Sequence, residues 1–107
     1  MSMGNTWVTD LRHFLNEEGI VPPDLPLPAE RLAYYFGSIV KAVTSHKNLC
    51  LSPSGIRCRR RPKHRRCPGE ILAFIDGEHN AAIRWQCPVC NDNGFISGWQ
   101  ESPWDLS

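Results

Sequence analysis

Long apolar stretches are missing from this chain of 107 residues. No uninterrupted run approaches the roughly 18 apolar residues that a membrane-spanning helix needs, so no membrane span is expected. Residues 1–6 lack the basic and apolar regions of a secretory signal peptide. A cytoplasmic, reducing location is therefore the expectation. At this length we expect a single domain that covers residues 1–107.

Sequence motifs of the common catalytic sites are missing as well. The chain has no glycine-rich phosphate loop, no serine, histidine and aspartate in a hydrolase order, and no paired-carboxylate motif. We therefore expect a protein that is not an enzyme and has no small-molecule substrate. Its five cysteines are an odd number, which fits poorly with a disulfide framework. In a reducing compartment, clustered cysteines are more often metal ligands or redox groups.

Four of the cysteines have a spacing that predicts one metal site. Eight residues separate Cys58 from Cys67, and Cys87 and Cys90 enclose Pro-Val. Four thiolates suit a tetrahedral zinc ion, and iron in a rubredoxin-like site uses the same ligands. A site with four protein ligands has no open position for a substrate. The pattern therefore indicates a structural or recognition role for the metal.

Two alternatives stay open for these cysteines. His64 could replace Cys58, because only two residues separate His64 from Cys67. Cys87 and Cys90 could instead form a redox dithiol, although such a pair usually opens a helix and here a glycine-bearing turn follows. Cys50 is left over, and its position between two leucines predicts a buried free thiol.

Acidic residues are absent from residues 57–67, which carry a net charge of +7, whereas residues 1–56 and 68–107 carry −1 and −5. The basic residues are Arg57, Arg59, Arg60, Arg61, Lys63, Arg65 and Arg66. Such a run can bind phosphates, so contact with a nucleic acid is the function we expect. The alternative is a structural protein or an adaptor for another protein, in which internal acidic groups and thiolates neutralise the run.

The apolar pattern predicts two helices followed by three strands. Residues 6–17 and 28–46 repeat apolar side chains at helical spacing, and we expect them to pack as a hairpin. Gly37 weakens the second helix or marks a close approach by another element. Residues 47–57 are expected to form a loop. Strands are expected at residues 71–75, 82–86 and 94–99.

The predicted fold class is therefore α+β. A helical hairpin within residues 5–47 would pack on a three-stranded antiparallel sheet within residues 56–102. This second part resembles the zinc-ribbon class, in which two cysteine-bearing turns hold one ion. The wide spacing of Cys58 and Cys67 departs from that class.

The whole chain also resembles a family of small bacterial proteins whose activity is uncharacterised. The resemblance is carried by Trp-Val-Thr-Asp at Trp7 to Asp10, Cys-Arg-Arg-Arg-Pro at Cys58 to Pro62, Cys-Pro-x-Cys at Cys87 to Cys90, Gly-Trp-Gln at Gly98 to Gln100, and Trp104-Asp105. It covers most of the chain and implies a bacterial protein. It implies no particular activity.

Overall fold

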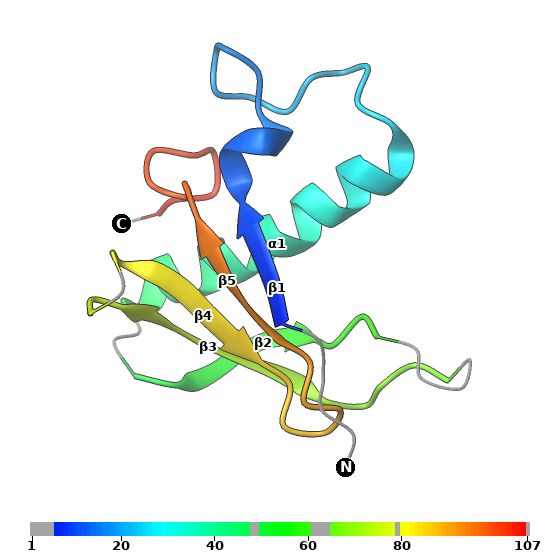
Figure 1. Cartoon of the computed structure of the whole chain (residues 1–107), viewed down its shortest axis with the longest axis vertical. Helices are drawn as coiled ribbons and strands as arrows, with labels where there is room; N and C mark the ends of the chain where they lie inside the picture. Colours follow the sequence, from blue (N-terminus) through cyan, green and yellow to red (C-terminus); the bar gives the residue numbers. More distant parts are fainter. Residues whose placement is uncertain (1–5, 48–49, 61–64, 79, 107) are drawn as a thin grey trace.

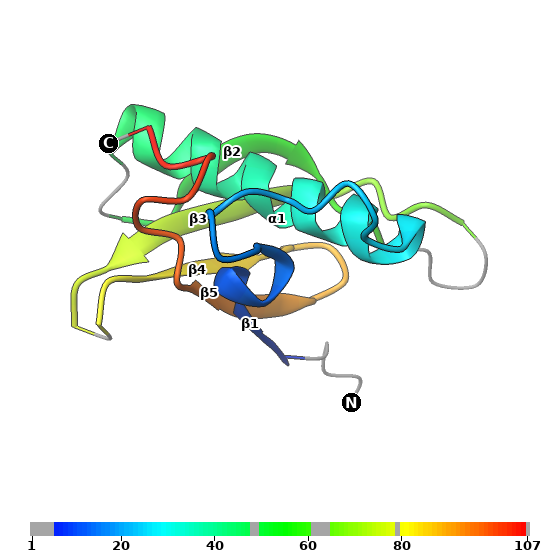
Figure 2. The same ribbon diagram turned by 90° about the horizontal axis from the view of Figure 1, so that it is seen from above.

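The computed structural model of the chain describes residues 6–47, 50–60, 65–78 and 80–106. One long helix lies across one face of a five-stranded sheet (Figure 1, Figure 2). In chain order the elements are β1 (Thr6–Asp10), the 3-10 helix η1 (Leu11–Phe14), α1 (Leu27–His46), β2 (Ser52–Arg57), β3 (Glu70–Asp76), β4 (Ala82–Gln86) and β5 (Asn93–Ser97). The strand order is β1-β5-β4-β3-β2, with β1 parallel to β5 and the other pairs antiparallel.

The long helix α1 forms where its sequence favours a helix. Proline lies in its first turn, where a missing amide costs nothing, and Glu30 complements the helix dipole there. The helix ends at His46, and the capping residue Lys47 has a left-handed φ of 50°. Its buried side chains recur at three- and four-residue intervals and face the sheet: Ala33, Phe36, Ile39, Val40 and Val43.

The sheet supplies the other half of the core. Alternate residues of the three central strands are buried beneath α1: Ile71, Ala73, Ile83, Trp85 and Ile96. Alternation with period two is the expected pattern of a sheet with one covered face. The three predicted strands correspond to β3, β4 and β5.

The prediction of a helical hairpin on a three-stranded sheet is wrong. The structure has one α-helix and five strands, because residues 6–10 form β1 and pair with β5. Thr6, Val8 and Thr9 are β-branched, which favours an extended backbone over a helix. The apolar spacing in residues 6–17 comes from a strand followed by the short helix η1, whose N-cap is Asp10.

The prediction of a loop at residues 47–57 is also wrong, because residues 52–57 form the edge strand β2. Pro53 and Gly55 suggested a loop. Proline is tolerated on an edge strand, where no further strand needs its amide. The pairing of β2 with β3 shifts between Pro53 and Arg57, and Gly55 has a φ of 79° within that irregularity.

The C-terminal segment docks on α1. Trp104 is 5% exposed, and its indole ring lies directly over Gly37. The amide of Leu106 donates to the Thr44 hydroxyl at 2.9 Å. Gly37 is thus a point of close approach, one of the two expectations for this residue. No helix in the described part of the chain has the length and hydropathy to cross a membrane.

The opposite face of the sheet is not covered by α1. There the Arg84 guanidinium lies over the rings of Phe74 and Phe95, 5.9 Å and 5.0 Å from their centroids. Val8, also on this face, is 83% exposed. Phe74, Arg84 and Phe95 take part in the lining of a hollow of about 480 Å³.

Candidate metal centre

An extension of the β2–β3 hairpin brings Cys58 and Cys67 together. Beyond the strands, the Cys58 amide donates to the Gly69 carbonyl at 2.9 Å, and the Cys67 amide donates to the Arg60 carbonyl at 2.8 Å. The two chain segments therefore remain paired as far as both cysteines. This pairing explains how an eight-residue spacing, too wide for a tight turn, still brings two thiols to one place.

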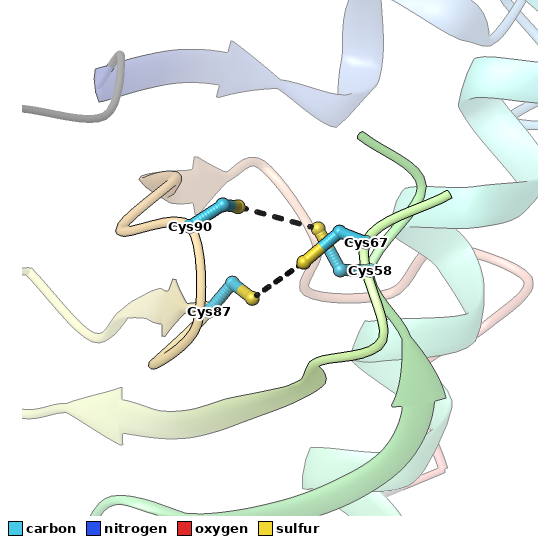
Figure 3. Close-up of side chains that lie close together, drawn as sticks. All are labelled: Cys58, Cys67, Cys87 and Cys90. Atoms are coloured by element: carbon cyan, nitrogen blue, oxygen red, sulfur yellow. Dashed lines mark hydrogen bonds between the residues drawn. The ribbon is translucent and has the colours of Figure 1, made fainter. Parts of the chain in front are cut away.

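A tight turn between β4 and β5 supplies Cys87 and Cys90. The Asn91 amide donates to the Cys87 carbonyl at 2.9 Å, and the Cys87 amide donates to the Asp92 carbonyl at 2.7 Å. Asn91 has a φ of 63°, a left-handed conformation that asparagine tolerates better than most residues. The turn directs both thiols toward the hairpin (Figure 3).

The four sulfur atoms lie within 4.8 Å of one another. The Sγ atoms of Cys58 and Cys90 are 3.7 Å apart, and those of Cys67 and Cys87 are 3.6 Å apart (Figure 3). All four are free thiols, because these distances are far longer than a disulfide bond. Zinc–sulfur bonds of about 2.3 Å in a tetrahedron place the sulfurs about 3.8 Å apart. The geometry of the donor set therefore fits one tetrahedral metal ion.

Backbone amides surround the sulfur atoms in a repeated pattern. The amide two residues after each cysteine points at its thiol: Arg60 at Cys58, Gly69 at Cys67, Val89 at Cys87 and Asp92 at Cys90. The first two contacts are 3.5 Å long. Amides in these positions stabilise negative sulfur and orient the ligands of a metal.

Burial and these amides act in opposite directions on the thiols. Burial raises the pKa of Cys58 and of Cys90 above the ordinary value. Burial also acts to raise the pKa of Cys87, but the amides of Cys90 and Val89 and the neighbouring thiols lower it overall. Cys58, Cys67 and Cys87 are each 1% exposed. A metal ion deprotonates the thiols that bind it. Its positive charge would then offset the free-energy cost of burying several negative sulfur atoms.

Gly69 closes the centre from the hairpin side. A Cβ atom at this position would overlap the sulfur of Cys87, and it would lie 3.1 Å from the Val89 side chain. Only glycine leaves room for the cysteine turn to approach the hairpin this closely. Gly69 is therefore required by the packing of the centre.

Asp92 connects the cysteine turn to two other segments, and sequence reasoning missed this role. Its carboxylate accepts from the Trp7 indole at 3.2 Å and from the Arg60 guanidinium at 3.1 Å. Asp92 is 6% exposed, so these partners offset the cost of burying its charge. The available signal was an acidic residue two positions after Cys90. Its partners, 85 and 32 residues away, are not evident from sequence.

The structure describes five of the seven predicted phosphate-binding residues. Arg57, Arg59, Arg65 and Arg66 are exposed, and none of them forms an ion pair with a described carboxylate. Arg60 differs, because it pairs with Asp92. Arg61 and Lys63 lie outside the described residues, as does His64, the predicted rival of Cys58.

The leftover cysteine does not match its expectation. Cys50 is exposed rather than buried, and it does not belong to the cluster. The neighbouring Leu51 is 42% exposed, so the apolar sequence around Cys50 does not mark a core position. Cys50 therefore serves as an internal control for the other four cysteines.

No family model, no curated protein and no solved structure matches the chain.

Proposed function

We propose that Cys58, Cys67, Cys87 and Cys90 bind a single zinc ion in a structural site. Support comes from four sulfurs at tetrahedral spacing, with an amide directed at each thiol. Four protein ligands complete the coordination of zinc and leave no position for a substrate or water. The proposal therefore assigns the centre no catalytic or redox role. Iron fits the same thiolates, and metal analysis distinguishes the two.

The metal would hold in place residues 58–67, which we call the basic segment. Cys58 and Cys67 lie at the two ends of residues 58–67, and the described parts of this segment project beyond the sheet (Figure 1). A metal that joins both ends to the β4–β5 turn fixes where the arginines lie. We further propose that this segment binds the phosphates of a nucleic acid.

The exposure of four arginines without carboxylate partners is the observation that carries this second proposal. Arg57 and Arg59 flank Cys58, and Arg65 and Arg66 precede Cys67. Unpaired guanidiniums that lie close together bind phosphates in pairs of hydrogen bonds and release counterions from the nucleic acid. Glu70 is the cross-strand neighbour of Arg57, but its carboxylate accepts from the Gly55 amide at 2.9 Å and forms no ion pair with Arg57.

The alternative is a structural or adaptor protein with an internally neutralised basic run. One observation favours it: Arg60 pairs with the buried carboxylate of Asp92. That pair accounts for a single arginine, whereas four others are exposed without such a partner in the described residues. Nucleic-acid binding is therefore the better supported function.

The test is the salt dependence of binding to labelled single-stranded and duplex DNA and RNA. Each phosphate contact contributes a slope of about −0.7 on single strands and about −0.9 on duplex DNA in a plot of log affinity against log salt. Replacing both Arg65 and Arg66 by Ala should reduce the size of the slope by about 1 to 2. The matched control replaces Arg31 and Lys41, two exposed bases of α1, and should leave the slope unchanged. No binding at low salt would refute the proposal.

A further inference from the structure

Beside the metal centre lies a second hollow, and two residues of the basic run, Arg59 and Arg60, take part in its lining. It has a volume of about 230 Å³ and is bounded by Trp7 of β1, by Leu32, Tyr35 and Phe36 of α1, and by Arg59, Arg60 and Asp92. Sites for drug-sized ligands begin at roughly 300 Å³, so this hollow suits a single ring system. It combines aromatic walls with positive charge at its rim.

The aromatic walls are held rigidly at their polar ends. The Trp7 indole N–H donates to Asp92 at 3.2 Å, and the Tyr35 hydroxyl donates to the Arg57 carbonyl at 3.2 Å. Trp7 nevertheless remains 45% exposed. A fixed, half-exposed indole can bind a planar ring at little cost in conformational entropy.

The charge around the hollow selects against a cationic ligand. Arg59 and Arg60 both line it, and the carboxylate of Asp92 is already paired with Arg60. The Arg59 guanidinium lies 5.6 Å from the centroid of the Tyr35 ring. A guanidinium stacked in this way is itself a platform on which a base can stack. The surroundings therefore favour a neutral ring attached to anionic groups.

The hollow on the uncovered face of the sheet is a weaker candidate for a stacked base. Its two phenylalanines, Phe74 and Phe95, are both in contact with the guanidinium of Arg84. Arg84 is the one basic residue in the lining of that hollow, and none of the described residues of the basic segment lines it. The hollow at Trp7 instead adjoins the exposed arginines of the basic segment, since Arg59 belongs to both.

We propose that this hollow binds one unpaired base of a single-stranded nucleic acid, stacked on Trp7 and the Arg59–Tyr35 pair. The flanking phosphates lie on the exposed arginines near Cys58 and Cys67. The inference rests on the proposed nucleic-acid contact and adds a preference for single strands over duplex, because a paired base cannot enter. On this proposal, Asp92 positions the Trp7 indole and the Arg60 side chain on either side of the base.

The test uses two variants of Trp7 and a labelled single strand of about 10 nucleotides, a length within known site sizes. Trp7→Phe keeps a stacking ring, and Trp7→Leu keeps only apolar volume. Loss of one stacked base costs about 1–3 kcal/mol, so Trp7→Leu should weaken binding about 5- to 150-fold. Trp7→Phe keeps the ring but loses the indole N–H that donates to Asp92, so it should bind more tightly than Trp7→Leu and no more tightly than the wild type. The control Tyr34→Leu removes an exposed ring outside the hollow and should have no effect.

Two further readouts separate stacking from folding. The salt slope of Trp7→Leu should equal that of the wild type, because the phosphate contacts are unchanged. Single-strand binding should quench the intrinsic fluorescence of the wild type more than that of Trp7→Phe, which retains three of the four tryptophans. Metal content and melting temperature confirm that each variant is folded.

The outcomes distinguish this inference from the proposed function. If wild type and Trp7→Leu bind single strands equally, with normal salt slopes, the stacking site is refuted and the phosphate contact stands. If no nucleic acid binds, both proposals fail. The base site is contradicted if the protein binds duplex more tightly than single strands. It is also contradicted if the protein binds a free mononucleotide as tightly as it binds the single strand.

Discussion

The core beneath α1 and the cysteine centre each depend on a glycine that allows close packing, but different forces stabilise the two regions. Beneath α1, Gly37 meets the indole of Trp104 within an apolar core. At the cysteine centre, Gly69 meets the sulfur of Cys87. The first region is stabilised by burial of apolar side chains, and the second gathers four thiols that gain little from burial alone. On the proposed function, the part of the core beneath α1 should fold without a cation, whereas the cysteine centre, which adjoins that core, should need one.

The largest expected effect comes from removing a metal ligand. Cys87→Ser should abolish stoichiometric zinc binding and lower the free energy of unfolding by about 4 kcal/mol or more, because loss of a metal is among the largest single-residue effects. Hydrogen exchange should increase in residues 57–69 and 87–93, while the helix-covered parts of β3 and β4 stay protected.

Cys50→Ser is the matched control, since Cys50 is exposed and outside the cluster. It should leave zinc content and unfolding unchanged. Equal losses in both variants would show that the comparison between core and centre is wrong.

Gly37→Ala should destabilise the core without affecting the metal. The new methyl group would overlap the Trp104 ring, and overpacking of this kind costs about 1–3 kcal/mol. Denaturant unfolding should show the loss in both the presence and the absence of a chelator. In Gly77→Ala the added Cβ meets no atom within 4 Å, so that variant should stay within about 0.5 kcal/mol of the wild type. A normal melting temperature for Gly37→Ala would mean that the C-terminal segment does not dock as described.

Gly69→Ala should weaken zinc binding, and its loss of stability should depend on zinc, unlike that of Gly37→Ala. The methyl group would displace the Cys87 sulfur, and we expect a loss of about 10- to 100-fold in zinc affinity, the range seen when groups behind metal ligands are changed. Competition with a chromophoric chelator measures this affinity. Added zinc should restore stability, because a ligand that binds only the folded state stabilises it by mass action. A stability loss that zinc cannot reverse would place Gly69 with the packed core instead.

The smallest effect is expected at the exposed pair of Asp10 and Arg12, which belongs to neither region. The hydrogen bond from Arg12 lowers the pKa of Asp10 to about 2. A depressed carboxylate pKa contributes stability above the unfolded value near 4, and this contribution is lost as the pH falls toward 2. Asp10→Asn keeps an N-cap acceptor for η1 and removes only the charge. Melting should change slightly at neutral pH and not at all near pH 2, and high salt should erase the difference.

The sequence predicts those helices and strands whose apolar periodicity is evident within the element itself. The stripe of Phe36, Val40 and Val43 predicts α1, and alternation around Ile83 and Trp85 predicts β4. Strand β1 was missed because its stability comes from pairing with β5, 87 residues later at the Thr6–Asn93 contact. A short segment of mixed periodicity does not reveal such a partner.

The cysteines were predictable for a chemical reason, since few other roles suit four thiols at this spacing in a chain without a disulfide pattern. The surroundings of the centre were not. The sequence does not reveal that the carboxylate of Asp92 accepts from both Trp7 and Arg60. The packing of Trp7 toward the basic segment depends on the placement of β1, so the hollow beside the centre could not be foreseen either.

Metal analysis of the purified chain, by mass spectrometry of both the element and the intact protein, tests the central claim most directly. The account predicts one zinc ion per chain in the wild type and in Cys50→Ser, and none in Cys87→Ser. A wild-type chain that retains no metal after exposure to zinc, or whose four clustered cysteines are joined in disulfides as purified, would contradict it.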